Sequence, residues 1–255
     1  MAEQRYNGSE LMICLASRAM VDKTTAFIGT GIPMLAASLA QKMHAPALTA
    51  IFEFGGTGAI LEKLPLAVGD MRTYNKALHA SGICDIMETA QRGFVEFGFL
   101  GGAQIDPHGN LNSTVIGDHA SPKVRLPGSG GANDVGSACW RTITIIRHAA
   151  RSFVEKVDFV TTPGYLTGPG AREAAGLPAG SGPYRVVTDL CTMDFDEETK
   201  RMRVKALNPG VTLDQVREST AFELIVPDEV GANEEPTDEE LRILREEVDE
   251  DKLYI

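Results

Sequence analysis

The sequence lacks several features that would place the protein outside a reducing compartment. No apolar run approaches the ~20 residues that cross a membrane, and the first six residues lack the charged-then-apolar layout of a signal peptide. The cysteines are far apart and form no Cys-x-x-Cys pair. They are Cys14, Cys84, Cys139 and Cys191. We therefore expect a cytoplasmic protein without membrane contact, whose free thiols are mostly buried.

Histidine pairs and basic patches are also absent. No two of the five histidines lie three or four positions apart, so the sequence predicts no metal site. The net charge is −11, and residues 228–251 hold twelve acidic residues and two arginines. The rest of the chain is almost neutral, which argues against nucleic-acid binding. We expect the acidic segment, residues 228–255, to be a solvated surface helix or arm.

The first half of the chain has a strand–helix–strand pattern. Residues 25–28 are typical of a short strand, and Gly29-Thr30-Gly31-Ile32-Pro33 is typical of a glycine turn that opens a helix. That helix is expected to end near Met43, and the apolar run 48–54 is expected to be a buried strand. An amphipathic helix over residues 9–21 precedes this βαβ unit.

The remaining elements are predicted from apolar runs and turn residues. We expect helices over 76–90, 212–219 and 236–248, and strands over 94–100, 123–126, 142–146, 157–161, 185–190, 193–195 and 202–207. A Gly/Pro-rich surface excursion is expected over 164–183, with Arg172 in a surface salt bridge. Residues 1–255 are therefore predicted to form a single α/β domain. Its sheet would be open and mostly parallel, with helices on both faces and an acidic C-terminal helix.

Glu53 is the most informative residue. It interrupts the apolar run 48–54 just before Gly55-Gly56, which places a carboxylate at the carboxyl end of a core strand, where open α/β sheets bind ligands. Three interpretations remain open: a solvent-facing residue of an edge strand, a buried structural ion pair, or a nucleophile or general base. The glycines favour the third, because they let a ligand approach and leave amide groups free.

Two glycine-rich segments are candidate binding loops. Gly29-Thr30-Gly31 lacks the third glycine of the dinucleotide fingerprint, since Met34 stands there, so a nicotinamide enzyme is excluded. The other segment, Gly128-Ser129-Gly130-Gly131-Ala132-Asn133, is either a flexible surface turn or a loop that presents amide donors to negative oxygens. A carboxylate with amide donors for an oxyanion suits acyl transfer. No Gly-x-Ser-x-Gly segment supports a serine hydrolase.

Longer motifs resemble one family along nearly the whole chain. They are Gly29 to Pro33, Phe99-Leu100-Gly101-Gly102-Ala103-Gln104-Ile105-Asp106-Pro107, Asn110 to Asp118, Gly128 to Asn133, Pro163-Gly164, Gly168-Pro169-Gly170 and Lys200-Arg201-Met202. In this order and spacing, they resemble the smaller (β) subunit of glutaconate CoA-transferase, a family I CoA-transferase of the 3-oxoacid CoA-transferase superfamily.

The resemblance implies a mechanism and a set of partners. Glu53 would be the catalytic glutamate that carries CoA as a glutamyl thioester, and Phe54 stands where the family has a polar residue. Gly55 and Gly128 to Asn133 would form the oxyanion and CoA-substrate loops, and Gly29 to Gly31 would line the substrate. Coenzyme A would be a substrate, with no permanently bound cofactor. The partner would be a larger α subunit of the same fold, in an α2β2 or larger hetero-oligomer.

The sequence leaves other activities open. Relatives of this fold include CoA-ester hydrolases that open a ring and decarboxylases of a methylglutaconyl thioester. Because both kinds lack this glutamate, Glu53 favours transfer between a carboxylate and a glutaconyl- or glutaryl-type acyl-CoA. A protein of another class, a non-catalytic subunit that only shapes its partner's site, also remains open.

Overall fold

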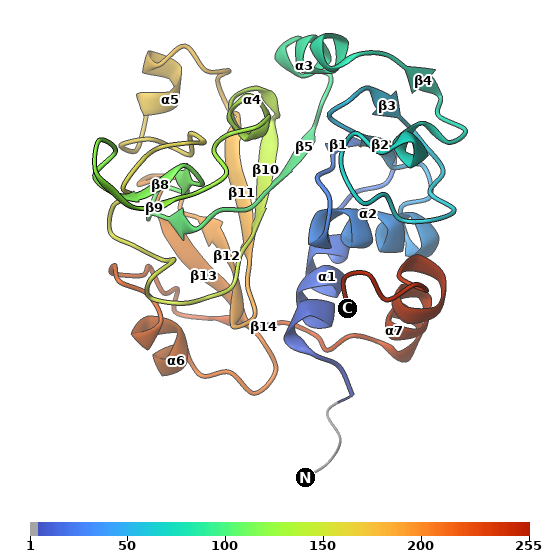
Figure 1. The fold of residues 1–255 in the computed structure, drawn as a ribbon. Helices are drawn as coiled ribbons and strands as arrows, with labels where there is room; N and C mark the ends of the chain where they lie inside the picture. Colours follow the sequence, from blue (N-terminus) through green and yellow to red (C-terminus); the bar gives the residue numbers. More distant parts are fainter. Residues whose placement is uncertain (1–4) are drawn as a thin grey trace. The chain divides into compact units, whose positions relative to one another are not determined.

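The computed structural model describes residues 5–255, whose contacts divide the chain into two compact units. Unit 1 holds the described residues up to Phe99 together with Glu235–Ile255, and unit 2 holds Leu100–Glu234. Both units combine strands and helices (Figure 1), so the predicted α/β class is confirmed. The single-domain extent over residues 1–255 stays a prediction.

Unit 1 contains the predicted βαβ motif. β1 pairs in parallel with β2 and with β5, and β3 and β4 add antiparallel pairs beyond β2. The strands are β1 (Thr25–Phe27), β2 (Thr49–Ile51), β3 (Gly56–Thr57), β4 (His79–Ala80) and β5 (Phe97–Leu100). The helical elements are α1 (Gly8–Arg18), α2 (Ile32–Met43), η1 (Met71–Tyr74), α3 (Ile83–Gln91), α7 (Asp238–Ile243) and η2 (Leu244–Val248).

Local sequence explains how α1 and α2 begin. The Asn7 side chain caps α1 in a capping box with Glu10, whose side chain returns to the Asn7 amide at 2.7 Å. α2 begins after Gly31, whose φ of 80° suits glycine, with Pro33 in the first turn. The apolar faces of both helices are buried. In Figure 1, α1, α2 and α7 lie side by side in unit 1, and their buried faces contribute to its core.

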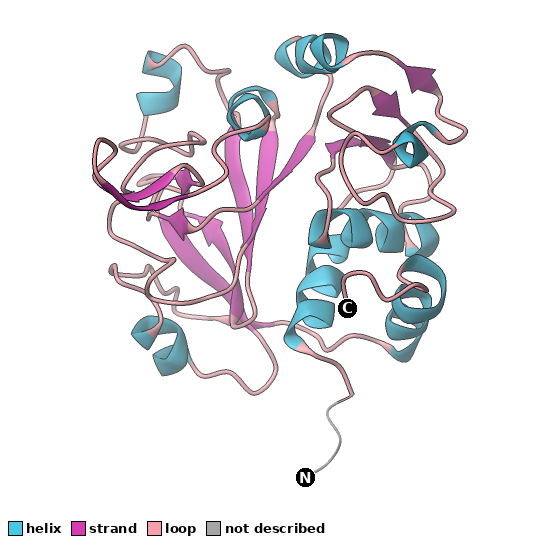
Figure 2. Cartoon of the chain, in the orientation of Figure 1, coloured by secondary structure: helices cyan, strands magenta, loops and turns pink. Residues whose placement is uncertain are grey.

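Unit 2 contains a run of five mixed strands and two small hairpins. The strand order is β14-β13-β12-β11-β10, with parallel outer pairs and antiparallel pairs from β11 to β13. These strands are β10 (Arg141–Ile145), β11 (Gly182–Val187), β12 (Cys191–Phe195), β13 (Met202–Leu207) and β14 (Gly231–Ala232). The hairpins pair β6 (Gln104–Ile105) with β7 (Leu111–Asn112) and β8 (Val115–Gly117) with β9 (Pro122–Arg125). The helices are α4 (Ala132–Ala138), α5 (Ala171–Ala174) and α6 (Leu213–Glu218) (Figure 2).

Several predicted elements differ from the structure. The helix expected over 76–90 begins only at Ile83, because β4 occupies the preceding residues and Gly82 caps the helix. The strand expected over 157–161 is absent, since these residues form bends and irregular loop. The excursion over 164–183 contains α5 and the start of β11. In the described part of the chain, every helix is too short or too polar to cross a membrane.

The acidic C-terminal segment forms a helix, one of the two forms expected from the sequence, but one side of this helix is buried rather than solvated. Its helix lies where predicted and is capped by Thr237. Leu241 and Leu244 on this helix are buried, so its apolar side packs against the rest of unit 1. From Glu235 onward, the segment is therefore part of the folded structure of unit 1, whereas residues 228–234 belong to unit 2.

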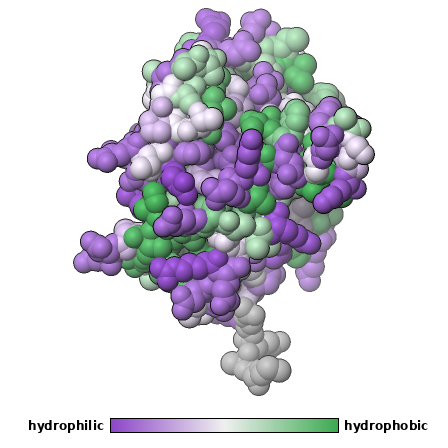
Figure 3. Space-filling view, turned by 90° about the vertical axis from the view of Figure 1, so that its left-hand side faces the viewer, coloured by the Kyte–Doolittle hydropathy of each residue, from purple (hydrophilic) through white to green (hydrophobic). Residues whose placement is uncertain are grey.

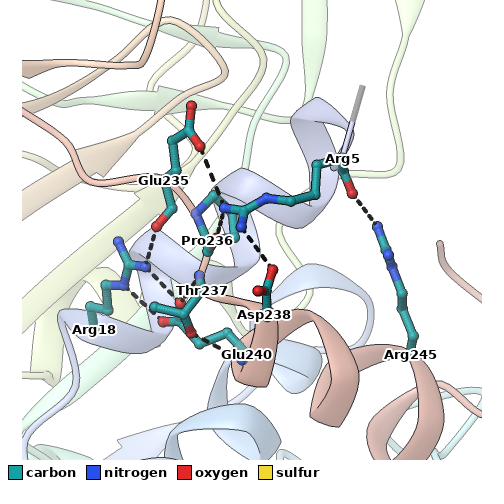
Figure 4. Close-up of polar contacts among 8 residues, drawn as sticks. All are labelled: Arg5, Arg18, Glu235, Pro236, Thr237, Asp238, Glu240 and Arg245. Carbon is teal, nitrogen blue, oxygen red and sulfur yellow. Dashed lines mark hydrogen bonds and ion pairs between the residues drawn. The ribbon is translucent and has the colours of Figure 1, made fainter. Parts of the chain in front are cut away.

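Ion pairs also attach this segment to the start of the chain. Glu240 receives a two-pronged ion pair from Arg18 at 2.6 and 2.8 Å, and Arg245 contacts Glu10 at 2.6 Å. In Figure 4, Arg5 and Arg18 point toward the start of the segment, and Arg245 reaches back to the Arg5 carbonyl. Because Glu10 and Glu240 are buried, their ion pairs are screened less than surface pairs.

His148 in unit 2 gives the protein a pH-dependent stability. Its ring stacks on Phe153 at 3.9 Å and is buried, which lowers its pKa from 6.5 to about 4, while nearby Asp189 opposes this shift. The unfolded state therefore binds more protons between these pH values, so stability falls as pH drops from 6.5 through 4. We expect a contribution of about 3 kcal/mol to be lost across this window.

Urea unfolding at pH 7.0 and pH 4.5 measures this loss, with His148→Gln as the comparison. The variant lacks the titrating ring, so its stability should change less between the two pH values than that of the parent chain. The same pH dependence in both proteins would contradict the assignment.

Candidate active site

Glu53 lies on a tight turn that joins β2 to β3. β2 ends at Ile51, and Ile51 pairs antiparallel with Thr57 across the turn. The Phe52 amide donates to the Gly56 carbonyl at 2.8 Å, and the Gly55 amide donates to the Phe52 carbonyl at 2.9 Å. The strand expected over 48–54 is therefore shorter than predicted, because the chain reverses direction directly after Phe52. Glu53 still follows the carboxyl end of a core strand.

The Glu53 side chain is half-buried and has no hydrogen bond or ion pair with any residue between 5 and 255. This geometry argues against one of the three interpretations drawn from the sequence, the buried ion pair, while the solvent-facing and the catalytic interpretations both stay open. Glu53 is not part of a buried ion pair, and it lies in a turn rather than within an edge strand. Its carboxylate oxygens are available to an incoming group.

Two glycines fix the conformation of this turn. Gly55 has a φ of +124°, and a Cβ there would lie 1.9 Å from the Ser81 carbonyl oxygen. A Cβ at Gly56 would lie 1.9 Å from the Thr73 carbonyl oxygen. Since the Gly55 amide already donates to Phe52, Gly55 does not have a free donor for an oxyanion. Gly55 is needed for close backbone packing, and its place in the oxyanion and CoA-substrate loops stays a prediction.

Gly55→Ala should therefore lower the free energy of unfolding by more than about 2 kcal/mol, through the left-handed φ and the clash with backbone. Gly29→Ala is the matched control, because Gly29 has open space around a Cβ and should change stability by less than about 1 kcal/mol. Urea denaturation of both variants measures the difference. Similar stability losses in the two variants would contradict the packing argument.

The turn Gly29-Thr30-Gly31 lies at the same sheet edge as Glu53. β1 and β2 are parallel neighbours in which Phe27 pairs with Ile51, and the Ile28 amide donates to the Ile51 carbonyl at 2.9 Å. Both strands therefore end at the same edge of the sheet, so the loops that follow them start side by side. α2 follows Gly31 and has no side-chain cap, so its N-terminal amides and positive dipole end lie at this edge.

The segment Gly128–Asn133 belongs to unit 2, so the site residues predicted from sequence are divided between the units. Gly128 donates to the Ser113 carbonyl at 2.8 Å, and Ser129 accepts from the Ala132 and Asn133 amides to begin α4. Within the described chain, the backbone amides of Ser129, Gly130 and Gly131 do not donate a hydrogen bond to any residue. A Cβ at Gly128 or Gly130 would meet open space, so positive φ explains these glycines.

Arg172 differs most from its predicted setting. Instead of a surface salt bridge, its side chain is only 1% exposed and its guanidinium binds the carbonyls of Pro163, Gly164 and Gly136 and the Ser181 hydroxyl. Burial lowers the pKa of Arg172 from its ordinary value. Arg172 therefore joins the loops of unit 2 and is not available to a substrate.

Two residues that contact the Glu53 turn were missed by reasoning from the sequence. The Tyr74 hydroxyl donates to the Phe54 carbonyl, and the Ser81 amide and hydroxyl donate to the Gly55 carbonyl at 3.2 and 3.4 Å. Both residues lie 20 or more positions after their partners in the turn and belong to no motif, so no pattern in the sequence indicates this contact. No group of three or more His, Cys, Asp or Glu residues in the described range could hold a metal ion.

An α/β sheet with a free carboxylate and a glycine turn at its carboxyl edge is suited to ligand binding and to chemistry on the ligand. A family model described as coenzyme A transferase matches residues 10–219. The chain belongs to this family.

Three relatives refine the comparison. The chain is 38% identical to the B subunit of 3-oxoadipate CoA-transferase from Pseudomonas knackmussii, over 94% of this chain and 92% of that protein. It is 37% identical to the B subunit of glutaconate CoA-transferase from Acidaminococcus fermentans, over 98% and 95%. The crystal structure of that enzyme superposes with a TM-score of 0.91 at 98% coverage of both chains and 35% identity. A cholesterol ring-cleaving hydrolase IpdB subunit of Rhodococcus jostii is 31% identical over 86% and 82%.

Proposed function

We propose that this chain is the B-type subunit of a heteromeric CoA-transferase that uses Glu53 as its nucleophile. The observation that carries this proposal is the geometry of Glu53: a half-buried carboxylate without an internal partner among residues 5–255, on a turn fixed by glycines at the carboxyl edge of the sheet. A structural carboxylate would be paired or fully solvated. The family membership supports the same assignment.

The chemistry proceeds in balanced steps. A Glu53 carboxylate oxygen attacks the acyl-CoA carbonyl and expels CoA thiolate, giving an acyl–glutamyl anhydride. The thiolate then attacks the glutamyl carbonyl, releases the first carboxylate and leaves a glutamyl–CoA thioester. An acceptor carboxylate repeats both steps in reverse, forms the new acyl-CoA and restores Glu53. No proton has to leave the nucleophile.

Each addition needs hydrogen-bond donors for a developing oxyanion, worth about 3–4 kcal/mol per donor in other acyl-transfer sites. In unit 1, the amides around Thr30 at the α2 N-terminus are the candidates beside Glu53, since the Gly55 amide already donates to the Phe52 carbonyl. The loop Gly128–Asn133 remains the candidate CoA-substrate loop. Coenzyme A enters as a substrate, and we infer that no permanent cofactor is held.

The substrate is inferred to be a dicarboxylyl-CoA of five or six carbons. Two relatives that are 37–38% identical are named for glutaconate and 3-oxoadipate, both dicarboxylates in that range. We also infer a cytoplasmic location, supported by the four cysteines, which are all free.

The partner is inferred to be an A-type subunit, because the relatives are named as B subunits. Unit 1 carries large apolar side chains that are well exposed beyond the Glu53 turn, including Leu66 at 62%, Met71 at 76% and Leu78 at 80%. These exposed apolar side chains support a partner-binding surface on this part of unit 1. Elsewhere, Figure 3 shows hydrophilic and hydrophobic residues interspersed over the face that it draws.

The test is the mass of the peptide that contains Glu53. The chain is purified with its A-type partner, incubated with glutaconyl-CoA or glutaryl-CoA, and treated with borohydride to reduce a glutamyl–CoA thioester to the alcohol. A mass loss at Glu53 that requires acyl-CoA is the expected result. Consumption of acyl-CoA with Glu53 unmodified would overturn the proposal.

That contrary result would favour the second candidate, a CoA-ester hydrolase. The observation behind it is Phe54, an apolar and half-exposed neighbour of Glu53, together with the 31% identity to a ring-cleaving hydrolase subunit. Release of free CoA without an acceptor acid would distinguish hydrolysis from transfer.

A further inference from the structure

Tyr74 reaches the Glu53 turn from a different part of unit 1. It is the last residue of the short helix η1, and its side chain is half-buried. The phenol hydroxyl donates to the carbonyl of Phe54, the residue directly after Glu53, and lies 3.3 Å from the Ser81 carbonyl oxygen. The hydroxyl therefore joins the turn to the start of the segment that follows β4.

The peptide group between Phe54 and Gly55 is held on both sides as a result. Its carbonyl accepts from Tyr74, and its amide donates to the Phe52 carbonyl at 2.9 Å. The next carbonyl, that of Gly55, accepts from the Ser81 amide at 3.2 Å. We call these three contacts the clamp. The contact from Tyr74 comes from a side chain and the other two come from backbone amides, so only the Tyr74 contact can be removed by a substitution.

The base of this clamp is rigid. η1 is capped by Asp70, whose side chain accepts from the Arg72 amide at 3.0 Å, and the Asp70 carbonyl accepts from the Thr73 amide and hydroxyl at 2.9 and 2.7 Å. Thr73 is fully buried, and its carbonyl packs so closely on Gly56 that no Cβ fits between them. The phenol therefore starts from a fixed backbone position.

We propose that Tyr74 is a positioning residue for Glu53, an inference that rests on Glu53 being the nucleophile. Glu53 has no hydrogen bond of its own within residues 5–255, so the direction of its carboxylate depends on the turn that carries it. Attack on a thioester carbonyl needs a near-attack geometry, and a misplacement of ~1 Å can cost about a hundredfold in rate. Tyr74 limits that freedom without touching the reacting atoms.

Tyr74→Phe tests this role in the complex with the A-type partner. We expect kcat and the single-turnover rate of borohydride-trapped thioester formation to fall at least tenfold, while the KM for acyl-CoA changes less than twofold. Tyr165→Phe is the matched control: its hydroxyl also donates to a backbone carbonyl, that of Pro183 at 3.0 Å, but in unit 2. It should leave kcat unchanged.

Rescue separates positioning from general support. 4-Aminophenylalanine at position 74 keeps an N–H donor at the far end of the ring and should restore most of the rate lost in Tyr74→Phe. If Tyr74→Phe assembles poorly with the partner, the 4-aminophenylalanine variant still tests whether a donor at this position supports the rate. An unchanged trapping rate in Tyr74→Phe, or equal losses in both Tyr→Phe variants, would overturn the inference. Failure to trap Glu53 in the parent enzyme would instead overturn the proposed function.

Discussion

A Glu53→Gln variant should lose at least about a thousandfold of its acyl-transfer activity while keeping its fold and its assembly with the A-type partner. The amide has nearly the shape of the carboxylate, and no hydrogen bond or ion pair of Glu53 within residues 5–255 is disturbed. What disappears is the anionic oxygen that attacks the thioester. The expected pattern is therefore a large loss of kcat with thermal stability almost unchanged.

The measurement is steady-state transfer from glutaryl-CoA to acetate, with the borohydride trap as an independent readout. Glu197→Gln is the matched control, because Glu197 is an exposed carboxylate on the turn that joins β12 and β13 and has no ion pair among the described residues. It should keep full activity. A Glu53→Gln enzyme with more than about a tenth of the parent kcat would exclude Glu53 as the nucleophile.

Arg172→Met should produce the largest loss of stability. The guanidinium is buried and donates four hydrogen bonds of 2.8–3.1 Å to the carbonyls of Pro163, Gly164 and Gly136 and to Ser181. Methionine fills part of the space but leaves the carbonyls of Pro163, Gly164 and Gly136 without the Arg172 donors. Since each such group costs roughly 1–3 kcal/mol, we expect a loss of about 3–5 kcal/mol.

For a chain of this length, such a loss corresponds to a fall in Tm of roughly 10 °C. Differential scanning calorimetry measures it, with Arg217→Met as the control. Arg217 forms an exposed ion pair with Asp214 at 3.3 Å, so its removal should cost less than about 1 kcal/mol. Equal effects of the two arginine substitutions would show that the loops of unit 2 do not depend on Arg172.

Local rules in the sequence predicted some parts of the site. Pro33 after the glycine turn identified the start of α2, whereas the strand expected over 48–54 ends at Ile51, before Glu53. Local rules could not show that the chain turns back at Phe52, since that reversal depends on pairing with β3 and on contacts from residues 73–81. The two-residue strands β3, β4, β6 and β7 are defined only by their partners.

Buried polar groups were the least predictable. Arg172 and Tyr74 are both bonded to backbone carbonyls from other segments, and no spacing in the sequence identifies such acceptors. The motif resemblance located Glu53 and the glycine segments but said nothing of the groups that hold them. Separation along the chain also explains why the ion pairs of the acidic segment were not predicted, because its partners Arg5 and Arg18 lie more than 200 positions away.

The position of the acidic segment at the end of unit 1 affects when unit 1 can complete its folding during translation. Because Glu235–Ile255 belong to unit 1 and follow unit 2 in the chain, unit 1 is interrupted by a long insertion. During translation, residues 100–234 can emerge from the ribosome and fold while unit 1 still lacks α7 and the partners of Arg5, Arg18 and Glu10. In the nascent chain, α1 and α2 therefore lack their contacts with the C-terminal segment until that segment has been synthesised.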